Sequence, residues 1–173
     1  MTLGHNTLPQ EDFRLMDIVG GGRSVSVLHP SQPIVAYAVG CVVIVYDLYN
    51  DSKTYLNGHQ YEIKAIAFST SEESLYTLDN DPTGSKLIIW DWQQGTSRSQ
   101  VELPIAGIQI DHFKICFDKT GSLMMILESS NLEIGGGYQV SLWNCMKNEV
   151  EIVSTMNLEL QCPCLDISFL PRT

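Results

Sequence analysis

Few residues in this chain have the types and spacing that catalysis needs. One conceivable hydrolytic set joins His59 to an Asp and to Ser69, and Asp111-His112 is another place for acid–base chemistry. Ser69 does not lie in the Gly-x-Ser-x-Gly turn that presents a hydrolase nucleophile, and the sequence offers no convergent acid, base and nucleophile. We therefore expect no catalytic residue and no enzymatic activity, with a hydrolase as the alternative from another class.

Two short motifs are candidates for ligand binding, and both favour a structural interpretation. Cys162-Pro163-Cys164 places two thiols where they could share a soft metal ion, but zinc takes four ligands and the preceding cysteine, Cys145, lies 17 residues earlier. Gly20-Gly21-Gly22-Arg23 resembles a phosphate cradle but has neither the following Gly-Lys-Ser/Thr nor a helix to begin. We expect a strand edge and a turn at these places, and no metal ion or cofactor.

Charge and composition narrow the class of partner. Twenty acidic residues against ten Lys and Arg give a net charge of −10, which disfavours nucleic acid and an anionic membrane as ligands. No apolar run is long enough to cross a bilayer, and Met1–Gln10 lacks the basic and apolar parts of a secretory signal. We expect a cytoplasmic protein that binds other proteins, without membrane insertion.

The most regular feature of the chain is the pair Gly58-His59 followed by Trp90-Asp91. Thirty residues lie between the two pairs, which is the spacing of the Gly-His and Trp-Asp signatures in one four-stranded propeller repeat. The residues around them form apolar or alternating runs bounded by Ser, Asp, Pro and Gly, as strands and turns do. The strands expected in this unit are residues 63–69, 74–78, 86–92 and 97–103.

The same pattern recurs on both sides of this unit. Tyr46-Asp47 stands 44 residues before Trp90-Asp91, and Trp143-Asn144 stands 53 residues after it. A loop at Glu128–Gly137 is expected to account for the longer second spacing. It contains three consecutive glycines, which strands disfavour. Residues 164–169 resemble the first strand of a fourth unit, and residues 13–19 are expected to supply the outer strand of the first.

These motifs resemble those of WD-repeat β-propeller proteins. The resemblance implies an all-β fold of four-stranded antiparallel blades, about three complete and a fourth begun, and therefore an incomplete propeller. The expected divisions are an extension at 1–12, blades at about 13–47, 51–92 and 97–144, and the start of a fourth at 149–173. Since propellers close with about four to eight blades, we interpret the chain as the N-terminal part of a longer propeller, a truncated product, or a chain that closes with a partner.

The resemblance also implies a structural role for the signature residues. In WD-repeat proteins the histidine of Gly-His joins a hydrogen-bond set with a Ser or Thr of the second strand, an Asp that follows it and the Trp of the third strand. The first and third units have no histidine at the matching place, so we expect the full set in the second blade alone. Its expected members are Gly58, His59, Thr77, Asp79 or Asp81, Trp90 and Asp91.

A narrower resemblance covers roughly residues 13 to 92. The segment Val35–Asp47, with a Tyr, a Gly-Cys pair and a valine-rich strand before an Asp, is similar to the opening repeat of two groups of large WD-repeat scaffolds. One group is the cilia- and flagella-associated proteins, and the other is the mitotic and centrosomal scaffolds. Both imply a non-enzymatic protein-interaction platform in a cytoskeletal assembly.

Exposed loops are the expected contact points of such a platform. The candidates are Asp79–Ser85 with Asp81, Glu128–Gly137 with Glu128 and Glu133, and Asn50–Lys53 on the opposite rim. Unpaired blade edges are a further place where the chain could associate with itself.

Overall fold

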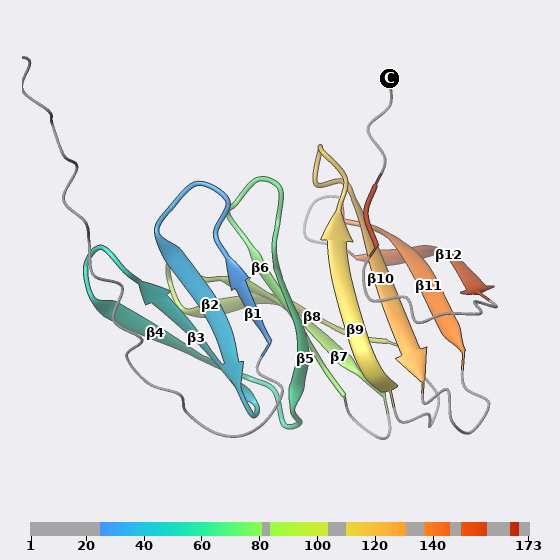
Figure 1. Cartoon of the computed structure of the whole chain (residues 1–173), viewed down its shortest axis with the longest axis horizontal. Coiled ribbons are helices and arrows are strands. Elements are labelled where there is room, and N and C mark those ends of the chain that lie inside the picture. The colour runs from blue at the N-terminus through green and yellow to red at the C-terminus, as the bar shows by residue number, and fades with distance from the viewer. Residues whose placement is uncertain are drawn as a thin grey trace, which may run out of the picture.

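A computed structural model describes residues 25–80, 84–103, 110–130, 137–145, 150–158 and 167–169. Every regular element in these ranges is a β-strand, and the strands form three separate four-stranded antiparallel sheets. In Figure 1 the sheets stand side by side, with the strands β5–β8 between the other two sheets. The all-β fold of four-stranded antiparallel units is therefore confirmed.

The first sheet contains β1 (Ser26–Leu28), β2 (Ile34–Val39), β3 (Val42–Asp47) and β4 (Ser52–Asn57), paired in that order. Gly40 allows the tight β2–β3 turn because its φ of 60° is left-handed. The sequence pattern did not predict β4, whose residues are mostly polar and exposed apart from Leu56. The first sheet takes β4 as its fourth strand, while residues 13–19, expected in that place, lie outside the described residues.

The second sheet contains β5 (Ile63–Phe68), β6 (Leu75–Asp79), β7 (Lys86–Asp91) and β8 (Thr96–Glu102). All five residues of β6 are buried, as are four of the six in β7, so both faces of this sheet are covered. Only the outer strand β8 is largely exposed.

The third sheet contains β9 (Ile110–Phe117), β10 (Leu123–Ser130), β11 (Tyr138–Asn144) and β12 (Glu151–Leu158). The sequence pattern predicts strands at residues 113–117 and 123–127 in this unit. The observed β9 and β10 are longer, because their pairing runs on past Leu127 to Ser130. The strand expected at residues 164–169 lies mainly outside the described residues, and residues 167–169 are not in a strand.

Two apolar interfaces hold the three sheets together. Side chains of the first sheet, such as Ala36 and Val43, pack with Phe68 and Trp90 on one face of the second sheet. The other face of the second sheet, including Leu78, packs with Met124 and Trp143 of the third sheet. The β1–β2, β5–β6 and β9–β10 turns lie at one end of this stack (Figure 1), and we call residues 29–33, 69–74 and 118–122 the turn row.

Candidate functional site

A buried chain of hydrogen bonds lies on the face of the second sheet that meets the first. His59 precedes β5, and its Nε2 lies 2.6 Å from Oγ1 of Thr77 while its Nδ1 lies 2.9 Å from Oδ2 of Asp79. The indole Nε1 of Trp90 donates to the same Thr77 oxygen at 2.7 Å. We assign the Nδ1–H tautomer, because Thr77 then accepts from Trp90 and donates to Nε2, and His59 donates to Asp79.

The structure brings together most of the residues that the resemblance implied, and Asp79 is the aspartate that it shows bonded to His59. Asp79 supplies the bond to His59, and its Oδ1 also accepts the Lys86 backbone N–H at 2.7 Å, which closes the loop from β6 to β7. Asp81 lies outside the described residues. Gly58 fits beneath the Trp90 ring, since a Cβ there would lie 2.9 Å from its Cη2 atom.

This geometry is that of a buried structural network and not that of a nucleophilic catalytic site. The Thr77 side chain is fully buried, so no substrate reaches its hydroxyl. Ser69 follows the far end of β5, where its Oγ contacts Ser71 and accepts the Ser74 N–H. The conceivable set of His59, an Asp and Ser69 is therefore not assembled.

Asp91 lies outside the buried chain and organises a surface turn. Its carboxylate accepts the Gln94 N–H at 3.0 Å and an Arg98 Nη2–H at 2.8 Å. The Arg98 bond, followed by the Gln94 bond, lowers the pKa of Asp91. Asp47 organises a surface turn of the first sheet in the same way, and hydrogen bonds from Asn50 lower the pKa of its carboxyl.

The third sheet replaces the buried chain with different residues at matching positions. Leu75 pairs with Trp90, and Met124 pairs with Trp143, so Ile126 matches Thr77 and Glu128 matches Asp79. With no hydroxyl on Ile126, the indole N–H of Trp143 donates instead to Ser141 at 2.7 Å.

Glu128 was expected to begin an exposed loop, and that expectation is wrong. The residue lies within β10, paired with Phe113 and Gln139, and its side chain is 6% exposed. Burial raises the pKa of Glu128 to about 7. A carboxyl group buried within a strand does not present a contact to a partner.

The turn row joins the three sheets through side chains that the sequence pattern did not identify. Ser31 Oγ donates to the Glu72 carboxylate, which connects the first two sheets. Thr70 Oγ1 donates to the Asp118 carbonyl at 2.7 Å, which connects the second and third. Each turn begins with a residue whose N–H donates to the carbonyl five residues on, at His29, Ser69 and Asp118. The shared spacing of five residues between donor and acceptor is the feature by which the three turns could have been aligned with one another.

His29 is the least expected member of the turn row. Its Nδ1 accepts the backbone N–H groups of Ser31 and Gln32, and its ring packs edge-on against Phe68 and Trp92 of the second sheet. Trp92 in turn donates its indole N–H to the Glu72 carbonyl at 3.0 Å. These contacts fix the first two turns relative to each other.

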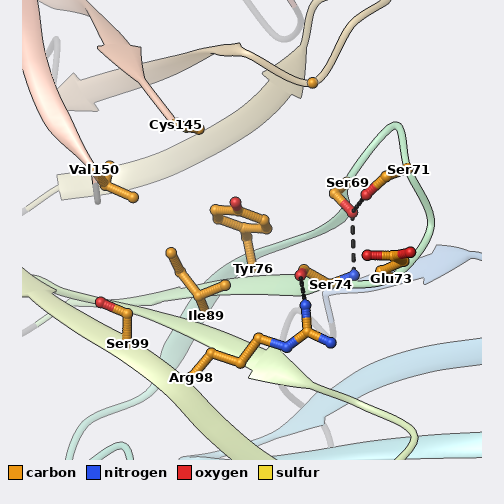
Figure 2. Close-up of a pocket in the computed structure, with 11 residues that line it drawn as sticks. Ser69, Ser71, Glu73, Ser74, Tyr76, Ile89, Arg98, Ser99, Cys145 and Val150 are labelled. Atoms are coloured by element: carbon orange, nitrogen blue, oxygen red, sulfur yellow. Dashed lines mark hydrogen bonds between the residues drawn. The ribbon is translucent and has the colours of Figure 1, made fainter. Parts of the chain in front are cut away.

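Two hollows flank the β5–β6 turn. The outer hollow lies between the second and third sheets and has a volume of about 170 Å³. Figure 2 shows Tyr76 and Cys145 on its walls, and Arg98 reaching across to Ser74. Burial, and after it the neighbouring Cys145, raises the pKa of Tyr76 to about 12; burial, and after it Asp118, raises the pKa of Cys145 to about 11. Both groups are therefore neutral at physiological pH.

The inner hollow, of about 440 Å³, lies along the ends of β1, β5 and β9. Apolar side chains supply most of its side-chain lining, and Glu72 supplies a carboxylate. The lining includes Val27, Leu28, Phe68, Glu72 and Phe117.

Comparisons with known proteins agree with this architecture. No protein-family model matches the chain. A stretch of 80 residues, 44% of this chain, is 32% identical to WD repeat-containing protein 90 of Xenopus tropicalis, and a stretch of 95 residues, 51% of this chain, is 30% identical to the protein of the same name in Mus musculus. The matches support a WD-repeat protein. They cover 4% and 5% of those relatives, so the chain spans a small part of their length.

The three sheets are consistent with WD-repeat blades of an incomplete propeller. The second blade carries the Gly-His and Trp-Asp signatures and the complete buried chain, whereas the first has Tyr46 at the position of Trp90. The Tyr46 hydroxyl donates to Asp51 at the surface, at 2.7 Å.

Several of the other candidate residues lie outside the part of the chain that the structure describes. Asp111 and His112 lie in β9, but their side chains are outside the described part, as are the residues expected in other motifs: Gly20, Gly21, Gly22, Arg23, Asp81, Glu133, Cys162 and Cys164. Within the described ranges, no three His, Cys, Asp or Glu side chains are grouped to hold a metal ion. The same ranges contain no helix long and apolar enough to cross a membrane.

Proposed function

We propose that this chain is part of a WD-repeat scaffold that binds other proteins, without catalysis, through the turn row. The supporting observation is the hydrogen-bonded continuity of the row, from Ser31 to Glu72 and from Thr70 to Asp118. Turns that are bonded to one another hold their side chains in a fixed arrangement. Less conformational entropy is therefore lost at this surface when a partner binds. The two matched relatives carry WD-repeat names, which supports the same general role.

The structure offers good positions for a test. Ser71 and Glu73 are exposed members of the turn row, and neither side chain makes a hydrogen bond to another blade within the described residues. Glu102 is an exposed glutamate at the end of β8, on the opposite end of the same blade. Charge changes at these positions leave the apolar interfaces intact.

The experiment compares proteins that co-purify with the full-length tagged protein from cells. The turn-row variant carries Ser71→Lys and Glu73→Lys, and the matched control carries Glu102→Lys. The proposal expects the turn-row variant to lose partners that the wild type and the control retain, with equal expression and melting temperature. Retention of every partner by the turn-row variant would show that binding uses another surface, such as the β3–β4 turn or the connection from β6 to β7.

We also propose a cytoplasmic, cytoskeletal location, in a ciliary or axonemal assembly, with a centrosomal or mitotic-spindle scaffold as the alternative. The resemblance of Val35–Asp47 to the opening repeats of both groups supports this proposal. Imaging of the full-length protein, tagged at its own locus, beside axonemal and centrosomal markers separates the two. Absence from both structures would contradict the proposal.

A further inference from the structure

The inner hollow presents an apolar surface to solvent at the turn row. Leu28 lines it and is 70% exposed, and Val27, Phe68 and Phe117 line it as well. Its volume of about 440 Å³ lies within the range of sites that take a small ligand or a side chain. Covering Leu28 with another apolar group would remove this surface from water and favour binding.

Carboxylates border both hollows of the turn row. Glu72 lines the inner hollow, and its neighbour Glu73 lines the outer one. Among the described residues no Lys or Arg lines the inner hollow, and the Arg98 that lines the outer one is paired with Asp91 at 2.8 Å. The chain as a whole has a net charge of −10. A cationic group beside the hollows is therefore attracted by local and overall charge.

The backbone at Glu72 gives a separate indication that a carboxylate matters there. Its φ is 64°, a left-handed conformation that is strained for a residue with a Cβ. Gly121 holds the matching place in the third turn, three residues after Asp118, with a φ of 71°. The second turn therefore keeps a glutamate where glycine would be unstrained.

We infer that the turn row binds a peptide segment in which an apolar side chain is flanked by Lys or Arg. The apolar side chain enters the inner hollow against Leu28 and Phe68, and the flanking cation lies beside Glu72 or Glu73. This inference rests on the proposed function and names the chemical class of its partner. A second copy of this acidic chain fits the site poorly, and a nucleic acid would bring phosphates toward carboxylates.

The test measures fluorescence anisotropy of labelled peptide pools on the full 173-residue chain. The first pool places one Leu between Lys and Arg residues; the second replaces the basic residues with Asp and Glu, and the third replaces the Leu with Ser. We expect the first pool to bind most tightly and its affinity to fall as salt is raised.

Protein variants then assign the binding to the hollows. Glu73→Gln should weaken the first pool by about twofold to fivefold, as expected for one exposed charge pair. Leu28→Ser should weaken it by about threefold to tenfold through lost apolar contact. Glu102→Gln and Leu48→Ser are the matched controls, since Glu102 lies at the other end of the blade and Leu48 is exposed but lines neither hollow.

Three results would overturn the inference: no measurable binding of the first pool, equal binding of the acidic pool, or equal effects of the hollow variants and their controls. None of these results would remove the proposed scaffold function, which the co-purification experiment tests separately. If partners are lost with the turn-row variant while the peptide pools fail, the row binds a partner of another chemistry.

Discussion

Thr77 is the residue on which the polar interior of the second blade depends. Its single oxygen accepts the Trp90 indole N–H and lies 2.6 Å from His59 Nε2, in a position with no access to water. Buried donors and acceptors that lose their partners carry a desolvation penalty of about 1–3 kcal/mol each. The hydroxyl therefore satisfies two other side chains at once.

Thr77→Val should lower the free energy of unfolding by about 2–4 kcal/mol, because the change keeps the shape and leaves two buried nitrogens without a partner. Urea unfolding followed by tryptophan fluorescence measures the loss. Thr70→Val is the matched control, since it makes the same chemical change at an exposed hydroxyl and should cost no more than about 1 kcal/mol. Equal losses in the two variants would mean that the buried chain contributes little.

Glu128 predicts a pH dependence with a definite sign. Burial raises the pKa of its carboxyl from 4.5 to about 7 in the folded protein. Below about pH 4.5 both folded and unfolded states are protonated. As the pH rises toward about 7 the unfolded state ionises first, so stability is lost over this interval, by roughly 3 kcal/mol at about 1.4 kcal/mol per pKa unit.

Glu128→Gln should remove this contribution while keeping the side-chain shape. Denaturant unfolding of both proteins between about pH 4 and pH 8 measures this contribution as the difference between their free energies of unfolding. The variant should gain stability relative to the wild type as the pH rises, and a difference that stays constant with pH would contradict the assignment.

At the scale of elements, the approach of the loop before β5 to strand β7 depends on a missing side chain. A Cβ on Gly58 would lie 2.9 Å from Trp90 Cη2 and 3.2 Å from Ile88 Cδ1. Trp90 has little freedom to move, because its ring is buried and its N–H is bonded to Thr77.

Gly58→Ala should therefore lower the free energy of unfolding by about 1–3 kcal/mol through overpacking. Gly137→Ala is the control, since a Cβ there meets no atom within 4 Å. Thermal melts of the two variants compare them directly, and an unchanged melt for Gly58→Ala would mean that the loop shifts without cost.

The elements differ in how far the sequence could predict them. Alternating apolar runs predicted β5 and β7 within a residue or two, because both of these strands are buried and bounded by turn residues. The outer strand β4 was missed because its residues are polar and mostly exposed. For β10 the pattern predicted residues 123–127 but missed the extension to Ser130, since nothing local in the sequence shows that pairing continues through Glu128.

The site was predictable where a motif carries it and not where distant segments meet. The Gly-His and Trp-Asp spacing placed His59, Thr77 and Trp90 in one set. The sequence left the choice between Asp79 and Asp81 open, and the hydrogen bond to His59 is made by Asp79, at the end of β6. The turn row escaped prediction because its bonds join residues far apart in the chain, 41 apart for Ser31 and Glu72 and 48 apart for Thr70 and Asp118.

At the scale of the whole molecule, the middle blade is covered on both faces while the outer blades leave surface open. On β12 of the third blade, Ile152, Val153 and Met156 are 47%, 57% and 61% exposed. This strand is the last in its sheet, so it has an edge without a strand neighbour among the described residues. Exposed apolar edges favour association with other strands.

We predict that the chain associates with itself at high concentration through this edge. Val153→Lys should reduce the association, because a charged residue on an edge strand opposes pairing. Light scattering after size exclusion, over a range of concentrations, measures the mass. Leu48→Lys removes a similarly exposed apolar residue in the β3–β4 turn and serves as the control; equal effects of both changes would point away from β12.

The turn row, which connects the three packed four-stranded sheets, is the proposed binding surface for the protein partner. Amide hydrogen exchange of the chain, alone and with a partner that co-purifies with the full-length protein, tests this most directly. We expect the partner to slow exchange in residues 29–33, 69–74 and 118–122, while the strands of the second sheet are already protected in the free chain. Protection confined to the opposite end of the blades, with the turn row unchanged, would contradict the account.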